Sequence, residues 1–93
     1  MKHLNIEEIH NTVIACISEY TKVTVELKSK LAGLNLNSID FIKVLVNLEN
    51  QLEFEFDEDE VTTDLYETVE DLGILIYKKM RKADWQLPYI ITE

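Results

Sequence analysis

Ser38 is the residue whose type and position best suit a chemical role. In the stretch "LNLNSID", residues 34–40, Asn37 is a good N-cap candidate and Asp40 lies three residues later, as in a capping box. Ser38 would then be the first residue of a helix, with its hydroxyl pointing outward. An anionic group attached to that hydroxyl would lie beside unpaired backbone amides and the positive end of the helix dipole. On position alone, however, a capping or loop serine is the simpler interpretation.

Other residues give little support for catalysis or metal binding. Ser38 lacks the flanking glycines of a nucleophile elbow, and only His3 and His10 could act as its base. Both histidines lie at or before the first predicted helix, where we expect them to be solvated. Cys16 lies beside an apolar helical face and is predicted to be a small buried side chain rather than a reactive thiol. The acidic run from Asp57 lacks the glycine and glutamate of a calcium loop, so we predict no specific metal site.

Composition and charge limit the classes of function. The chain has 93 residues, 46% of them hydrophobic, with only two Gly and one Pro, which fits one compact and mostly helical domain. Nine Lys and Arg against 18 Asp and Glu give a formal net charge of −9, which disfavours nucleic acids and anionic membrane surfaces. Basic patches on other proteins are the natural partners. With one cysteine, no visible secretion signal and no membrane span, we expect a cytoplasmic monomer without an internal disulfide.

Apolar periodicity predicts a small all-α bundle. Three main helices are predicted at residues 5–20, 38–52 and 68–82, and a minor helix is predicted at 58–65. Residues 21–37 are predicted to be a long loop with a short turn at 28–32, because β-branched residues, glycine and asparagine disfavour a long helix there. Its leucines are expected to pin it to the core: Leu27, Leu31, Leu34 and Leu36. The predicted fold is therefore a four-helix bundle with a short third helix and a long loop between helices one and two.

The C-terminal segment 83–93 is predicted to be an apolar tail of a single domain, which spans residues 1–93 and has its core at about 5–82. Pro88 favours an extended conformation over "WQLPYIITE", residues 85–93. The apolar residues of this tail favour packing against the bundle, with docking to another protein as the alternative; they are Trp85, Leu87, Tyr89, Ile90 and Ile91.

The helix predicted at 38–52 has two apolar stripes on nearly opposite faces. With Ile39 at 0° and 100° per residue, one stripe falls between about 140° and 240° and is predicted to face the core. It consists of Phe41, Val44, Leu45, Leu48 and Leu52. Ile39, Ile42 and Val46 fall between about −60° and 0°, and so small a bundle cannot bury both stripes. The second stripe is therefore predicted to be exposed and to bind partner proteins, with coverage by the chain itself as the alternative.

The second stripe lies in a strongly acidic part of the sequence. From Asp40 to Asp71 there are twelve Asp and Glu residues and one basic residue, Lys43. An apolar stripe in an acidic frame suits partners that have an apolar groove rimmed by Arg and Lys. Electrostatic steering would bring such partners together quickly.

These residues resemble the signature of acyl carrier proteins. The segment "LNLNSIDFIKVLVNLENQLEFEFDEDEV", residues 34–61, is similar to the family pattern of Leu-Gly-x-Asp-Ser-Leu/Ile-Asp, a helix ending in Leu-Glu, and an acidic entry to the next helix. Ser38 stands where the family serine carries 4′-phosphopantetheine, and Leu48 and Glu49 match the helix end. "TVEDL", residues 68–72, resembles the entry to the last helix, so the resemblance spans the whole architecture.

Three departures from the family pattern concern the neighbourhood of the serine. Asn37 replaces the usual Asp before the serine, which keeps the helix cap but removes a negative charge. Asn35 replaces the usual glycine, and Lys43 lies where an acid often contacts partners. These differences imply a specialised carrier with its own enzymes rather than the housekeeping fatty-acid carrier.

The resemblance implies a carrier protein rather than an enzyme. A phosphopantetheinyl transferase would move 4′-phosphopantetheine from coenzyme A to Ser38, and a ligase would load an acyl or aminoacyl group as a thioester. Synthases or transferases of a fatty-acid, polyketide or nonribosomal peptide pathway would then use that group. The resemblance assigns partner docking to Asn37, Ile39, Asp40, Ile42, Lys43, Val46, Glu49, Asp59 and Glu60. The main alternative is an unmodified acidic adaptor that binds partners through the same helix.

Overall fold

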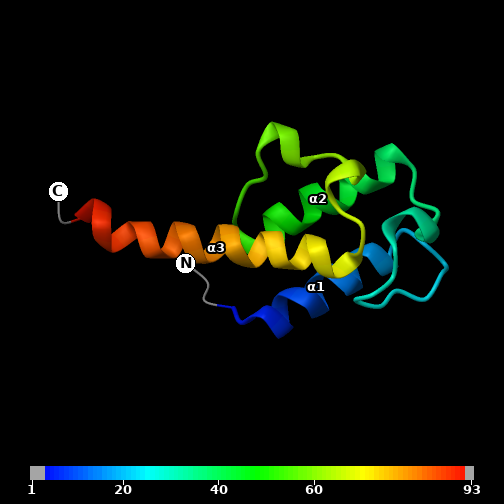
Figure 1. Cartoon of the computed structure of the whole chain (residues 1–93), viewed down its shortest axis with the longest axis horizontal. Coiled ribbons are helices and arrows are strands. Elements are labelled where there is room, and N and C mark those ends of the chain that lie inside the picture. Colours follow the sequence, from blue (N-terminus) through cyan, green and yellow to red (C-terminus); the bar gives the residue numbers. More distant parts are fainter. Residues whose placement is uncertain (1–3, 92–93) are drawn as a thin grey trace.

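Three α-helices form a small bundle (Figure 1). The computed structural model describes the backbone of residues 4–91 and the side chains of residues 4–81. The helices are α1 (Ile6–Ser18), α2 (Ser38–Leu52) and α3 (Val69–Ile91), and short 3₁₀ helices lie between them as η1 (Leu31–Leu34), η2 (Glu58–Glu60) and η3 (Thr63–Leu65). Over residues 4–91 the only strand-like pairing is a single bridge between Lys30 and Thr68. The predicted all-α fold is confirmed, although two 3₁₀ turns take the place of the minor third helix.

Both α2 and α3 pack against α1. A capping box starts α1: the Asn5 side chain accepts a hydrogen bond from the Glu8 amide at 2.8 Å, and the Glu8 carboxylate accepts one from the Asn5 amide at 3.1 Å. Cys16 is 1% exposed on the inner face of α1. Burial raises the pKa of its thiol, and the negative charge of Glu19 raises that pKa further. The prediction of a small buried side chain is thus confirmed.

His10 corrects the sequence analysis, because it is buried rather than solvated. It is 9% exposed and lies where α1 meets α3, with its ring against Gly73. A Cβ atom at position 73 would overlap the ring, so glycine is what lets the two helices approach so closely. Among the described residues, the Nε2 atom of His10 has no hydrogen-bond partner. His10 is buried because of its spacing: it comes three residues before Val13 and seven before Ile17, on the stripe that faces the core.

The long loop 21–37 covers the start of α3 while burying its own leucines. The amides of Val69 and Glu70 donate hydrogen bonds to the carbonyl oxygens of Ser29 and Leu27, at 3.0 and 2.9 Å. Two of the helix's first amides therefore find acceptors in the loop. As predicted, Leu31 and Leu34 are buried, and Leu27 and Leu36 pack against the core. The helical turn begins at residue 31, not at residue 28 as predicted.

α3 is longer than the sequence analysis predicts. It continues to Ile91, so Pro88 lies inside a helix and the extended conformation predicted for the tail is wrong as far as residue 91. Proline removes one helical hydrogen bond and only biases the residue before it away from helix, so a long helix can tolerate it. Figure 1 shows the last turns of α3 projecting beyond α1 and α2. The predicted packing of the tail concerns the side chains of residues 83–93, which lie outside the described residues.

The inner stripe of α3 is the predicted one. Val69, Leu72 and Ile76 are fully buried, and Met80 packs half-buried against the same core. No helix in the described part of the chain is long and apolar enough to cross a membrane.

Candidate functional site

Ser38 is the first residue of α2, and it is exposed. Asn37 caps the helix: its side-chain oxygen accepts a hydrogen bond from the Asp40 amide at 2.7 Å, and its carbonyl accepts one from the Phe41 amide at 3.0 Å. Within residues 4–81, the amides of Ser38 and Ile39 and the Ser38 hydroxyl have no hydrogen-bond partner. The tip of α2 therefore presents one hydroxyl beside two free backbone donors, at the positive end of the helix dipole.

The turn before Ser38 fixes where α2 begins. η1 ends at the buried Leu34, and Asn35 follows with a φ of 59°, in the left-handed region that glycine and asparagine adopt most readily. The Thr21 hydroxyl donates a hydrogen bond to the Leu34 carbonyl at 2.7 Å. This bond ties the turn to the start of the long loop, so Ser38 is held on a defined turn.

α2 has one buried and one exposed apolar face, as the sequence predicts. The side chains of the core stripe are at most 3% exposed: Phe41, Val44, Leu45, Leu48 and Leu52. On the other face, Ile39 is 65% exposed, Ile42 is 49% exposed and Val46 is 46% exposed. Lys43 is exposed on the same side. We call Ile39, Ile42 and Val46 the exposed stripe; it begins next to Ser38.

The acidic residues predicted to dock partners are not equally available. Asp59 is exposed, and Asp40 is half-buried at the start of α2. The Glu49 carboxylate accepts a hydrogen bond from the Phe56 amide at 2.8 Å. The Glu60 side chain is only 16% exposed, and its carboxylate lies 2.8 Å from the Lys79 ammonium. Two of the predicted docking acids are therefore engaged in contacts within the chain.

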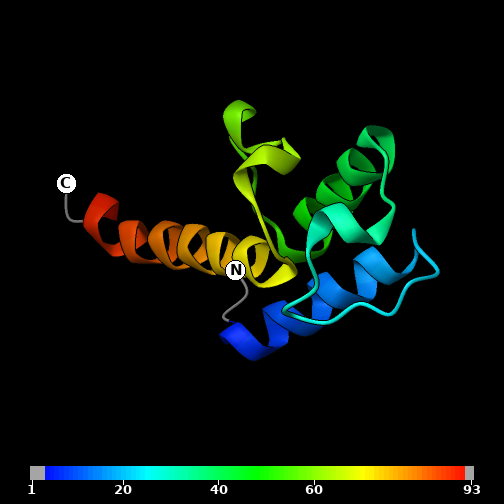
Figure 2. The ribbon, with the colours of Figure 1, turned by 45° about the vertical axis from the view of Figure 1, so that its right-hand side comes forward.

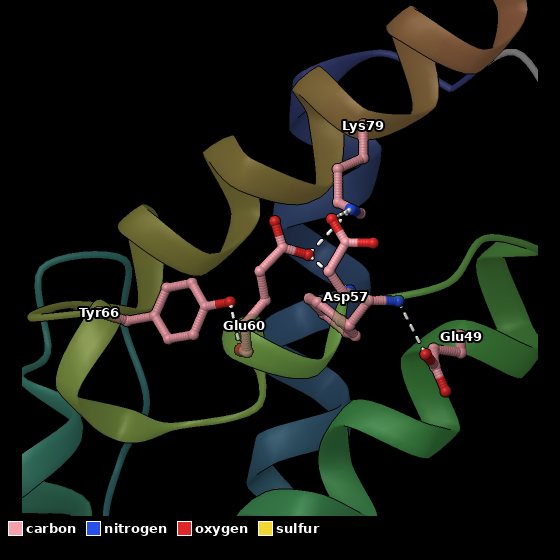
Figure 3. A network of polar contacts seen from close by, with 6 residues as sticks. Glu49, Asp57, Glu60, Tyr66 and Lys79 are labelled. Carbon is pink, nitrogen blue, oxygen red and sulfur yellow. Dashed lines mark hydrogen bonds and ion pairs between the residues drawn. The ribbon is translucent and has the colours of Figure 1, made fainter.

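Lys79 of α3 holds the segment between α2 and α3, residues 53–68, which we call the connector (Figure 3). Its ammonium lies 3.3 Å from the Asp57 carboxylate as well as 2.8 Å from that of Glu60. The Tyr66 hydroxyl donates a hydrogen bond to the Glu60 carbonyl at 2.7 Å, and the centre of its ring lies 6.2 Å from that of Phe41. Figure 2 shows the connector on the side of the bundle away from α1. Neither Lys79 nor Tyr66 was predicted as part of the site; for Lys79, a lysine 22 residues from its acid leaves no local pattern.

The Lys79 ammonium and the Tyr66 hydroxyl both keep their protons at neutral pH. Burial lowers the pKa of Lys79, but hydrogen bonds and charges from Glu60 and Asp57 outweigh it, so the net shift is upward. Burial raises the pKa of the Tyr66 hydroxyl, and the negative charges of Glu60 and Asp59 raise it further. Lys79 is therefore a cation and Tyr66 a hydrogen-bond donor in this network. In the part of the chain that the structure describes, no group of three or more His, Cys, Asp or Glu is arranged to hold a metal ion.

One known protein family matches the chain by its sequence model. The family is described as the phosphopantetheine attachment site, and the match covers residues 11–76, more than half of the 93 residues. The chain belongs to the phosphopantetheine attachment-site family. No curated protein and no solved structure gives a significant match. The resemblance to acyl carrier proteins is thus confirmed at the level of the family.

Membership of the phosphopantetheine attachment-site family fixes the prosthetic group and the general role. Its members are carrier domains, not catalytic ones, and their covalently attached group is 4′-phosphopantetheine. Such carriers interact with synthases and transferases. The residues at the tip of α2 fit this group, because an exposed hydroxyl and two free amides can receive a phosphate. The left-handed backbone of Asn35 also explains how asparagine can stand where acyl carrier proteins have glycine.

Proposed function

We propose that this carrier holds acyl or aminoacyl groups on a 4′-phosphopantetheine arm attached to Ser38 and moves them between biosynthetic enzymes. The observation that supports this best is the Ser38 hydroxyl itself: it is exposed, has no hydrogen-bond partner among the described residues, and lies at the tip of a capped helix inside the matched region. The bound arm would supply a flexible terminal thiol that holds its cargo as a thioester. The pathway would be a specialised fatty-acid, polyketide or nonribosomal peptide pathway in the cytoplasm.

The residues around Ser38 orient and stabilise the attachment rather than activate the serine. No base is hydrogen-bonded to the Ser38 hydroxyl within residues 4–81, so removal of its proton is left to the phosphopantetheinyl transferase. The free amides of Ser38 and Ile39, together with the helix dipole, favour a negatively charged phosphate at this oxygen. Asn37 caps the helix as an aspartate would, but it adds no negative charge beside that phosphate.

The exposed stripe would supply the apolar part of the docking surface. Because these three side chains are about half exposed, burying them against a partner stabilises a complex by about 1–2 kcal/mol each, before the costs of association are subtracted. The proposed frame of this surface consists of Asn37, Asp40, Lys43, Glu49, Asp59 and Glu60. Because most of these residues are acidic, the partners would present Arg and Lys around an apolar groove. They would include the transferase, a ligase that loads acyl or aminoacyl groups, and a synthase.

Intact-protein mass spectrometry tests the attachment directly. The full chain is incubated with coenzyme A, Mg²⁺ and a promiscuous phosphopantetheinyl transferase, and we expect a mass gain of one phosphopantetheinyl group. The Ser38→Ala variant should show no gain, because it lacks the accepting oxygen. Ser18→Ala is the matched control: Ser18 is also exposed on a helix, but its hydroxyl bonds the Ile14 carbonyl, so loading should be unchanged.

Two results would contradict the proposal. An equal mass gain in Ser38→Ala would place the attachment at another residue. No gain in the wild-type chain, while a known carrier is fully loaded in the same reaction, would favour an unmodified acidic adaptor that binds partners through the exposed stripe alone.

A further inference from the structure

The place of Glu60 in the fold conflicts with a simple docking role. A partner's basic side chain could bind this carboxylate only by competing with Lys79, which lies 2.8 Å from it. Asp57 shares the same lysine at 3.3 Å, but 73% of its side chain is exposed. The ion-pair cluster is therefore closed on the side of α3 and open to solvent at Asp57. Figure 3 shows how the three side chains lie, and the exposure of Asp57 leaves its carboxylate accessible to a second cation.

The first half of the connector begins with Phe54 and Phe56, which pack half-buried against the core and contact each other edge to face, whereas the η2 turn that follows has no such anchor. In η2 and η3, which are both fully described, no side chain is buried. Val61 and Leu65 are 42% and 52% exposed, and the buried side chain of the connector is Tyr66, which lies near its end. Within residues 4–81, the ion pairs that join η2 and its cap Asp57 to α3 are therefore those of Lys79.

We propose that the two ion pairs of Lys79 form an electrostatic latch, and that a partner carrying arginine side chains opens it by taking Glu60 and Asp57 from Lys79. Docking of such a partner and release of the connector from α3 are then one coupled event. Ion pairs near a protein surface are weak, so exchanging one cation for another changes the free energy little. Arginine has the advantage in this exchange, because its planar group can bind a carboxylate through two parallel hydrogen bonds.

Release of η2 would change contacts in the core beneath it. The Glu60 carbonyl is the acceptor of the Tyr66 hydroxyl, and the Tyr66 ring contacts Phe41 on the buried face of α2. Movement of Glu60 therefore removes the partner of a buried hydroxyl and loosens the cover over α2. The kind of partner that opens the latch rests on the proposed function. The test of the latch does not, because it needs no modification of Ser38.

Amide hydrogen exchange measured by NMR on the full, unmodified chain tests the latch. The amides to follow are those hydrogen-bonded within the connector: Phe56, Asp57, Glu60 and Tyr66. In Lys79→Met, which keeps an apolar stem of similar length, we expect these amides to exchange about two to ten times faster than in the wild type. Amides in the middle of α1 should not change. Lys78→Met is the matched control, because Lys78 is the exposed neighbour of Lys79 and should leave the connector unchanged.

Wild-type exchange rates in the connector of Lys79→Met would overturn the latch, as would equal acceleration of every amide in the chain. Glu60→Gln breaks the same ion pair from the other side and should give the same local acceleration. It serves as the second variant if Lys79→Met does not fold.

A hexa-arginine peptide tests the coupling to a basic partner. We expect it to accelerate connector exchange in the wild type more than NaCl of equal ionic strength does, and to have little further effect in Lys79→Met. Unchanged or slower exchange in the wild type would show that a cationic partner does not open the latch. If Ser38 is never loaded but the connector responds as expected, the latch is supported and the carrier function is contradicted. If Ser38 is loaded but the connector does not respond, the carrier function is supported and the latch is contradicted.

Discussion

α2 and the connector follow one another along the chain, yet different forces hold them in place. α2 is anchored by five buried apolar side chains, and its cap is made by the residue next to Ser38. The connector starts with the half-buried Phe54 and Phe56, and the Phe56 amide is bound by the Glu49 carboxylate, but η2 itself buries no side chain and is fixed to α3 by Lys79. Apolar burial changes little with salt, whereas exposed ion pairs are screened by it. The helix that presents the serine is thus firmly positioned, while the segment beside it responds to charge.

The largest effect should come from weakening the apolar anchor of α2. Leu48 is fully buried, so Leu48→Ala should lower the free energy of unfolding by about 2–5 kcal/mol. Ile42→Ala removes an apolar side chain from the exposed stripe of the same helix and should change that free energy by less than about 0.5 kcal/mol. Urea denaturation followed by circular dichroism measures both. Similar losses in the two variants would mean that Ile42 belongs to the core.

The sequence was sufficient for α2 because everything that defines this helix is local. Its bounds follow from Asn37 as the cap and from the end of the apolar periodicity at Leu52. The separation of its two stripes follows from the helical repeat alone. The same local logic predicts the buried leucines of the long loop. The same spacing would place His10 on the inner stripe of α1, but we predicted a solvated histidine there and the structure buries it.

The connector and the end of α3 could not be predicted in the same way. The contacts of Lys79 join residues 22 and 19 positions apart, and no periodicity marks such pairs in advance. The predicted short helix at 58–65 is split into two turns, because its few apolar residues are exposed and do not stabilise a helix by packing. The length of α3 was missed because proline only biases the chain against helix. Long-range polar contacts and overridden local biases therefore explain why the connector and the end of α3 were predicted wrongly.

A charge placed in the exposed stripe tests whether this face of α2 binds the transferase while the other face holds the fold. Ile42→Asp should lower kcat/KM for loading by the transferase roughly three- to tenfold, because the exposed half of the Ile42 side chain no longer contributes about 0.8–1.5 kcal/mol of apolar burial at the interface. The circular dichroism spectrum should stay that of the wild type, since Ile42 is 49% exposed. Asn50→Asp is the control: it adds the same charge to an exposed position near the other end of α2 and should leave kcat/KM nearly unchanged. Equal losses in both variants would assign the effect to charge rather than to the stripe.

The smallest effect concerns the one buried hydroxyl of the connector. Tyr66→Phe removes the bond to the Glu60 carbonyl and should lower the free energy of unfolding by about 0.5–1.5 kcal/mol at pH 7. The pKa of Tyr66 is raised in the folded chain, so above pH 10 the unfolded chain loses a proton that the folded chain still holds. The wild type should therefore lose its advantage over Tyr66→Phe as the pH rises above about 10, by up to about 1.4 kcal/mol per pH unit. Urea denaturation of both chains between pH 8 and 11 measures this difference. A constant difference over that range would show that the pKa of Tyr66 is not raised in the folded chain.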